Sequence, residues 1–131
     1  MPARMKALLI VALGGAVGSV ARYALSEWAR AALGAGFPYG TIAVNVIGSF
    51  AMGVLAHLAR TTLILSPPLA LGLTTGLLGG FTTYSTFNDD TVRLLTGSAF
   101  GRAALNIGVT LFAALGAGFA GLFVARHIAS H

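Results

Sequence analysis

The sequence predicts an all-α membrane protein with four transmembrane helices in a single domain. Of its 131 residues, 56% are hydrophobic and only 8% are charged, whereas charged residues make up about 25% of soluble domains. A helix needs about 20 apolar residues to cross a bilayer, and four stretches meet or nearly meet that length. They are residues 7–25, 40–59, 69–88 and 103–125. None alternates apolar and polar residues as the strands of a transmembrane barrel do, so helices are expected throughout.

The first predicted span covers residues 5–32. The charged start and the apolar run that follows are also typical of a secretory signal. The full spanning length and the three further spans favour a retained helix instead. Gly14 and Gly18 are four residues apart, a spacing that lets two helix backbones approach closely. Residues 34–38 form the turn that follows, and Pro38 suits a helix start.

The second predicted span covers residues 38–60 and contains one amide side chain, that of Asn45. An asparagine in a span commonly forms a hydrogen bond to another helix, worth about 0.6 kcal/mol on average in a membrane. The same amide can instead donate to a ligand in a polar pathway. The residue alone leaves both interpretations open.

The third predicted span covers residues 67–95 and is expected to break near its middle. Residues 79–87 combine two adjacent glycines with four serine or threonine side chains. Glycine costs about 1 kcal/mol in helix propensity, and hydroxyls offer the backbone other hydrogen-bond partners. Carbonyl oxygens freed at membrane depth need protein or a water-filled cavity around them, and converging carbonyls can hold a hard cation.

The residues after this break also suit an anion. Tyr84 and Phe87 share a helix face if the helix resumes there, and the edges of aromatic rings are electropositive. The fourth predicted span, residues 99–127, adds Asn106 and Thr110 as neutral polar groups. A small, strongly hydrated anion needs many weak donors that replace water and still release the ion. Amides, hydroxyls and ring edges meet that requirement.

Several classes of function are excluded by the polar inventory. The only carboxylates, Glu27, Asp89 and Asp90, lie toward span ends, so no titratable group sits centrally as a proton-coupled pump requires. Paired helical histidines of metalloproteases are absent, as is cysteine, and an enzyme is not expected. Although the net charge is +5, the basic residues stand singly at span ends, which argues against nucleic-acid binding.

The basic residues are divided equally between the two ends of the spans. Because Lys and Arg bias sets orientation in a membrane, four residues against four indicates no preferred orientation. A dual-topology chain that pairs as an antiparallel homodimer is therefore predicted; the alternative is one topology fixed by a translocase or by one dominant charge. The two groups are Arg4, Lys6, Arg60 and Arg126, and Arg22, Arg30, Arg93 and Arg102.

Three stretches together resemble the Fluc or CrcB family of fluoride channels: residues 14–23, 40–50 and 79–87. The resemblance extends over essentially the whole chain in length and span order, and the third stretch is highly specific. It implies an antiparallel homodimer with two pores in the inner membrane of a bacterium. Such a dimer passively exports fluoride that entered as the neutral acid, and so relieves fluoride toxicity.

The resemblance also implies site residues. Fluoride would pass the Asn45 amide and the ring edges of Tyr84 and Phe87, and then a track of hydroxyls. The candidates for that track are Ser85, Thr86 and Thr110. A structural sodium ion that is not transported would lie at the dimer centre, held by the backbone carbonyls of Gly79 and Thr82 from each subunit. Arg22 would attract anions in a vestibule or pack on the neighbouring subunit, and the packing role is favoured.

The sequence departs from the family pattern in two places. Tyr84 stands where the family usually has Phe, so its hydroxyl either adds a donor or narrows the path. Asn88, Asp89 and Asp90 stand where the family has Ser and then Glu. Asp90 either replaces that Glu or is a solvated helix end.

Two other classes of protein compete with the channel interpretation. A small multidrug transporter also has four helices and often dual topology, but the resemblance fails because the first helix lacks a central Glu. A non-transporting membrane scaffold would use its polar residues only to join helices. The scaffold predicts that Asn45 and Phe87 can be replaced without loss of flux.

Overall fold

The computed structural model describes residues 1–131 and consists of helices joined by short turns. In chain order the elements are α1 (Ala3–Leu33), α2 (Tyr39–Thr61), α3 (Pro67–Leu71), η1 (Gly72–Leu78), α4 (Gly79–Phe81), α5 (Tyr84–Thr96) and α6 (Phe100–Ala129). Three of them, α1, α2 and α6, are long and apolar enough to cross a membrane. The predicted all-helical class is confirmed, and the chain is an integral membrane protein.

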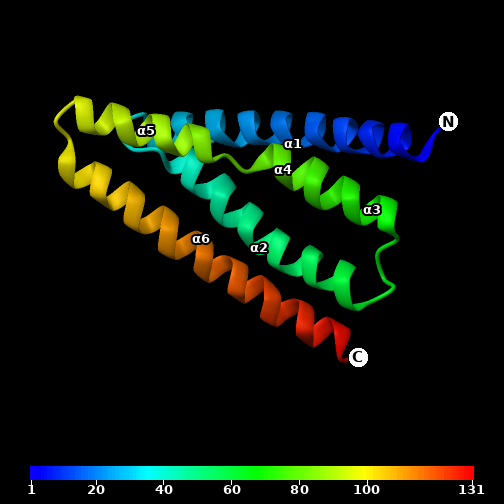
Figure 1. Ribbon diagram of the computed structural model, residues 1–131. Helices are drawn as coiled ribbons and strands as arrows, with labels where there is room; N and C mark the ends of the chain where they lie inside the picture. Colours follow the sequence, from blue (N-terminus) through cyan, green and yellow to red (C-terminus); the bar gives the residue numbers. More distant parts are fainter.

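The helices form two packed pairs, and α2 of the first pair also contacts α1 and η1 of the second (Figure 1). One pair is α2 with α6, which lie along one another over most of their length. The other is α1 with the row formed by α3, η1 and α4. Both chain termini and the α2–α3 turn lie at one end of the molecule, and the α1–α2 and α5–α6 turns lie at the other.

Glycines bring the backbone of α1 against that of η1 and α4. A Cβ atom on Gly14 would lie 2.5 Å from the carbonyl oxygen of Gly72 and 2.9 Å from the amide nitrogen of Leu77. A Cβ on Gly80 would lie 2.6 Å from the carbonyl oxygen of Gly15. Interfaces between membrane helices are enriched in small residues, which let the backbones approach closely. Gly14 and Gly18, four residues apart, thus form a helix contact within one chain, against η1 and α4.

The segment from α3 to α5 changes its helical form twice. Residues Gly72–Leu78 form a π-helix, a wide form that often occurs at functional sites. The α-helix α4 then ends at Phe81, and Thr82 and Thr83 are extended, with ψ of 157° and 117°. Helix α5 begins at Tyr84, where the Thr83 hydroxyl accepts a hydrogen bond from the Thr86 amide at 3.2 Å and caps the new N-terminus.

Candidate functional site

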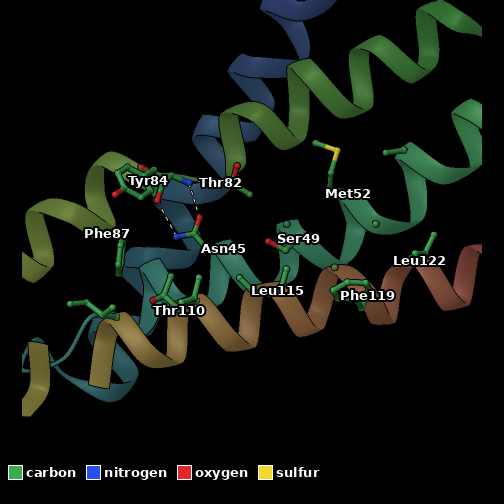
Figure 2. A pocket seen from close by; sticks show the side chains of 18 of the residues that line it. Asn45, Ser49, Met52, Thr82, Tyr84, Phe87, Thr110, Leu115, Phe119 and Leu122 are labelled. Atoms are coloured by element: carbon green, nitrogen blue, oxygen red, sulfur yellow. Dashed lines mark hydrogen bonds between the residues drawn. The ribbon is translucent and has the colours of Figure 1, made fainter. Parts of the chain in front are cut away.

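A cavity of about 970 Å³ lies between α2, α5 and α6, beside the extended residues Thr82 and Thr83 (Figure 2). Its wall is mainly apolar along α6 and the second half of α2, and Arg60 is its one charged residue. Most of the polar groups, and the rings of Tyr84 and Phe87, gather at the end next to α5, whereas Phe119 lies farther along α6. Five residues predicted from the sequence line it: Asn45, Thr82, Tyr84, Phe87 and Thr110.

Asn45 holds the backbone of Thr83 through two hydrogen bonds. Its Nδ2 donates to the Thr83 carbonyl at 3.0 Å, and the Thr83 amide donates to its Oδ1 at 2.8 Å (Figure 2). Both residues are buried, and an unpaired backbone group there would cost about 1–3 kcal/mol. An amide nitrogen carries two protons, so one N–H of Asn45 remains available to a ligand.

This arrangement frees the carbonyl groups of Gly79 and Thr82. In a continuous α-helix each carbonyl accepts from the amide four residues later. The Thr83 amide bonds to Asn45 and not to Gly79, and the Thr86 amide bonds to the Thr83 hydroxyl and not to Thr82. The two carbonyls predicted as cation ligands are therefore among the carbonyls that have lost their helical partners at this break.

The aromatic rings of Tyr84 and Phe87 lie together at the start of α5. Their centroids are 5.7 Å apart and their planes are inclined by 60°. Phe87 is half-buried and points from α5 toward the α6 side of the cavity, where Thr110 lies (Figure 2). Tyr84 is 77% exposed, so its hydroxyl is not committed to a partner within the chain.

The hydroxyl groups divide into two sets. Thr110 lines the cavity and donates to Asn106 Oδ1 over a long 3.4 Å. Ser85 and Thr86 lie outside the cavity and are exposed on α5. Within that turn Thr83 Oγ1 donates to Thr86 Oγ1 at 3.0 Å. The proton of Thr86 is therefore free for another acceptor.

Two further predicted residues lie apart from the cavity. Gly79 is exposed on the row of helices beside α1, and Arg22 is half-buried on α1 without an ion pair or a side-chain hydrogen bond. A half-buried arginine without a partner is an unusual placement in an apolar helix. The single chain supplies it with no partner.

Asp90 joins α5 to α2. It accepts a hydrogen bond from Thr41 Oγ1 at 2.7 Å and one from Arg93 at 2.7 Å, and its side chain is only 11% exposed. The interpretation of Asp90 as a solvated helix end is therefore wrong. The exposed Asp89, 67% accessible and 3.2 Å from Arg93, is closer to that description.

Sequence reasoning did not assign roles to Thr83, Thr41 or Thr91. Thr83 caps α5 and receives the Asn45 amide, and Thr41 bonds Asp90. A threonine directly before a helix start is a recognisable cap signal, so Thr83 was open to prediction once the position of the break was known. Thr41 and Thr91 carry no such local signal, because their partners are distant in the sequence.

Comparisons with known proteins match most of the chain to one family. The family described as "CrcB-like protein, Camphor Resistance (CrcB)" matches residues 9–122. A protein of Sorangium cellulosum named "Fluoride-specific ion channel FluC" is 52% identical over 118 residues, which are 90% of this chain and 93% of the relative. Proteins of the same name from Geobacter metallireducens and Geobacter sulfurreducens are 42% and 45% identical over 124 residues, which are 95% of this chain and 100% of each relative. This chain therefore belongs to the CrcB family.

Proposed function

We propose that the chain is a fluoride-selective ion channel that passively exports fluoride across the inner membrane of a bacterium and so relieves fluoride toxicity. The observation that carries this proposal is the cavity, which brings the Asn45 amide, the rings of Tyr84 and Phe87 and the Thr110 hydroxyl together. The names of the bacterial relatives describe a channel with this ion. They describe no enzyme.

The chemistry of the cavity suits an anion that must bind and leave. Its polar groups at the α5 end are uncharged, and one Asn45 N–H is free after the clamp on Thr83. Aromatic edges add weakly positive groups without a formal charge. A fixed cation among them would hold fluoride too strongly for rapid release, and Arg60, at the last turn of α2, is the only charged residue in the wall.

The third span of this channel is formed by α3, η1, α4 and α5 together. Their 28 residues, from Pro67 to Phe81 and from Tyr84 to Thr96, would extend roughly 40 Å at helical rise, enough to cross a bilayer. Each piece alone is too short to be a span. Four spans with one interrupted at Thr82 and Thr83 would thus make up each subunit.

A second, antiparallel copy of the chain is proposed to close the cavity and complete two pathways per dimer. The cavity of the single chain is lined largely by apolar side chains such as Leu115 and Leu122, which a neighbouring protein or lipid must cover. The equal division of Lys and Arg between the ends supports insertion in both orientations. The half-buried Arg22, which has no partner within the chain, is expected to pack on the neighbouring subunit.

A structural sodium ion at the dimer centre is part of this proposal. The donor set fits such an ion, because the Gly79 and Thr82 carbonyls have lost their helical partners and uncharged oxygen atoms suit a hard cation. Bound there, the ion would neutralise the converging carbonyl dipoles of both subunits. It would stay in place while fluoride moves.

Fluoride efflux from liposomes tests the channel. Purified protein in vesicles loaded with potassium fluoride should release fluoride when a potassium ionophore is added, and vesicles loaded with potassium chloride should retain chloride. A fluoride electrode follows the release. Absence of fluoride flux, or equal leakage of both anions, contradicts the proposal.

The sodium site has a separate test. Purification and assay with a large organic cation in place of sodium should abolish fluoride efflux, and adding sodium back should restore it. Potassium in place of the organic cation serves as a control for ionic strength. Unchanged efflux without sodium would show that Gly79 and Thr82 do not hold this ion.

A further inference from the structure

Asn106 on α6 is completely buried, and its amide makes the only side-chain hydrogen bond between α6 and α5. Its exposed fraction is 0%, and that of its partner Thr91 is 7%. The Nδ2 atom of Asn106 donates to Thr91 Oγ1 at 3.0 Å. The two helices diverge from the turn that connects them (Figure 1) but still pack on one another.

This bond is one of a series of hydrogen bonds with a defined direction. An amide nitrogen can only donate, so the Thr91 hydroxyl accepts from Asn106. The same hydroxyl donates to the Phe87 carbonyl at 2.8 Å. The Oδ1 atom of Asn106 accepts from Thr110 at 3.4 Å. One buried amide thus connects the hydroxyl of Thr110 to the backbone of Phe87, and both of these residues line the cavity.

The other side-chain hydrogen bonds of α5 to distant parts of the chain go to α2. The start of α5 is held by Asn45 on Thr83, and its middle by Thr41 on Asp90. Only Asn106 adds a side-chain hydrogen bond from the helix to α6. Without that bond α5 would keep its hydrogen bonds to α2, and packing contacts alone would set the separation of Phe87 and α6.

We infer that Asn106 is a positioning residue of the anion pathway, which acts through Thr91 to set the separation of Phe87 and Thr110. Because Asn106 is fully buried and does not line the cavity, it does not contact the ion itself. The inference rests on the proposed fluoride conduction. The competing interpretation is that the pair only joins two helices, in which case its loss lowers stability and leaves the rate per channel unchanged.

Thr91→Val tests the inference with little change in shape, since valine keeps the volume and removes the hydroxyl. Thr91→Ser restores the hydroxyl. The matched control is Thr96→Val on the same helix, because Thr96 also donates to the carbonyl four residues earlier, at 2.9 Å, but is exposed and has no partner on α6. Asn106→Leu removes the same bond from the other side.

The assay is fluoride efflux at a protein density low enough that most vesicles hold at most one channel. The fraction of vesicles that empty reports folded protein, and the rate in those vesicles reports conduction. Thr91→Val and Asn106→Leu should each lower that rate about tenfold, the order expected for one buried hydrogen bond. Their combination should be no slower than either alone. Thr96→Val should stay within about twofold of the wild type, and Thr91→Ser should recover most of the rate.

Three results would overturn the inference. The first is a wild-type efflux rate in the active vesicles of Thr91→Val, with only the fraction of active vesicles reduced. The second is a loss of efflux rate in Thr96→Val as large as that in Thr91→Val. The third is an efflux rate in Thr91→Ser that does not recover. Because the rate is measured only in vesicles that contain a working channel, partial misfolding does not obscure it. Wild-type protein without fluoride flux would instead refute the proposed function, so the two failures are distinct.

Discussion

Asn45 combines a structural and a chemical task in one side chain. Its two hydrogen bonds to the backbone of Thr83 stabilise the extended conformation there. They also engage the Thr83 amide, which in a continuous helix would donate to the Gly79 carbonyl. Asn45 also lines a cavity with aromatic rings and hydroxyl groups. The same residue therefore supports the predicted cation ligands and the predicted anion path.

Asn45→Asp should abolish fluoride efflux. A carboxylate at this position accepts but does not donate, so it would oppose the Thr83 carbonyl at about the present 3.0 Å and would repel an anion as well. Asn88→Asp makes the same change on an exposed side chain of α5 and should leave efflux close to that of the wild type. Liposome efflux of both variants provides the comparison. Wild-type flux in Asn45→Asp would remove this residue from the pathway.

Phe87→Ile should also abolish efflux while the protein stays folded, because isoleucine fills a similar volume without an electropositive edge. Phe112→Ile is the control, since Phe112 is 72% exposed on α6 outside the cavity. Tyr84→Phe keeps the ring and should keep efflux, which would assign the task at that position to the ring and not to the hydroxyl. Gel filtration checks assembly, and efflux in Phe87→Ile equal to that in Phe112→Ile would contradict the prediction.

Asn45 and Thr110 were predicted because they are polar groups in apolar spans, and Tyr84 and Phe87 because they share a helix face after the expected break and match the family pattern. The structure brings these four to one cavity. The connection from Asn106 through Thr91 was not foreseen, because it depends on which faces of α5 and α6 meet. Pairings between helices are set by three-dimensional packing, which one sequence does not specify.

For the broken segment too, the sequence predicted one part of the structure and three-dimensional packing determined another. A break was expected from the low helix propensity of Gly79 and Gly80, yet both glycines lie inside helix α4 and the extended residues follow at Thr82 and Thr83. Gly80 instead permits close contact with α1. The extended residues are stabilised by the Asn45 clamp and the Thr83 cap, so long-range contacts outweigh propensity at this point.

Gly14→Ala should strongly destabilise the protein, because its Cβ would lie 2.5 Å and 2.9 Å from backbone atoms of η1 that cannot move aside like a flexible side chain. Overpacking of this kind typically costs about 1–3 kcal/mol. Gly116→Ala is the control: nothing lies within 4 Å of its Cβ, and alanine improves helix propensity by about 1 kcal/mol.

The two variants can be compared by thermal unfolding in detergent, together with the yield of monodisperse protein. Gly14→Ala should unfold at a lower temperature than the wild type, and Gly116→Ala at the same temperature or a higher one. Equal stability of the two variants would mean that the α1–η1 contact is looser than the structure describes.

At the scale of the whole molecule, the two ends differ in their acidic residues. All three carboxylate side chains, on Glu27, Asp89 and Asp90, lie with the α1–α2 and α5–α6 turns, and they pair there with Arg30 and Arg93. The end with both termini has no acidic side chain. Orientation in a membrane follows Lys and Arg and depends little on Asp and Glu, so this asymmetry does not by itself select a topology.

Added lysines should therefore force the chain into one orientation. Leu63→Lys with Ser130→Lys raises the positive charge at the end with the termini, and Ala35→Lys with Thr96→Lys raises it at the opposite end; all four positions are exposed. If an antiparallel dimer is the working unit, each pair of substitutions alone should abolish fluoride efflux from cells. Expression of both variants together should restore it, because each variant then supplies one orientation.

Leu63→Gln with Ser130→Gln controls for the loss of the native side chains. Full efflux from either lysine variant alone would show that a single orientation suffices, and the equal division of basic residues would then carry no functional meaning.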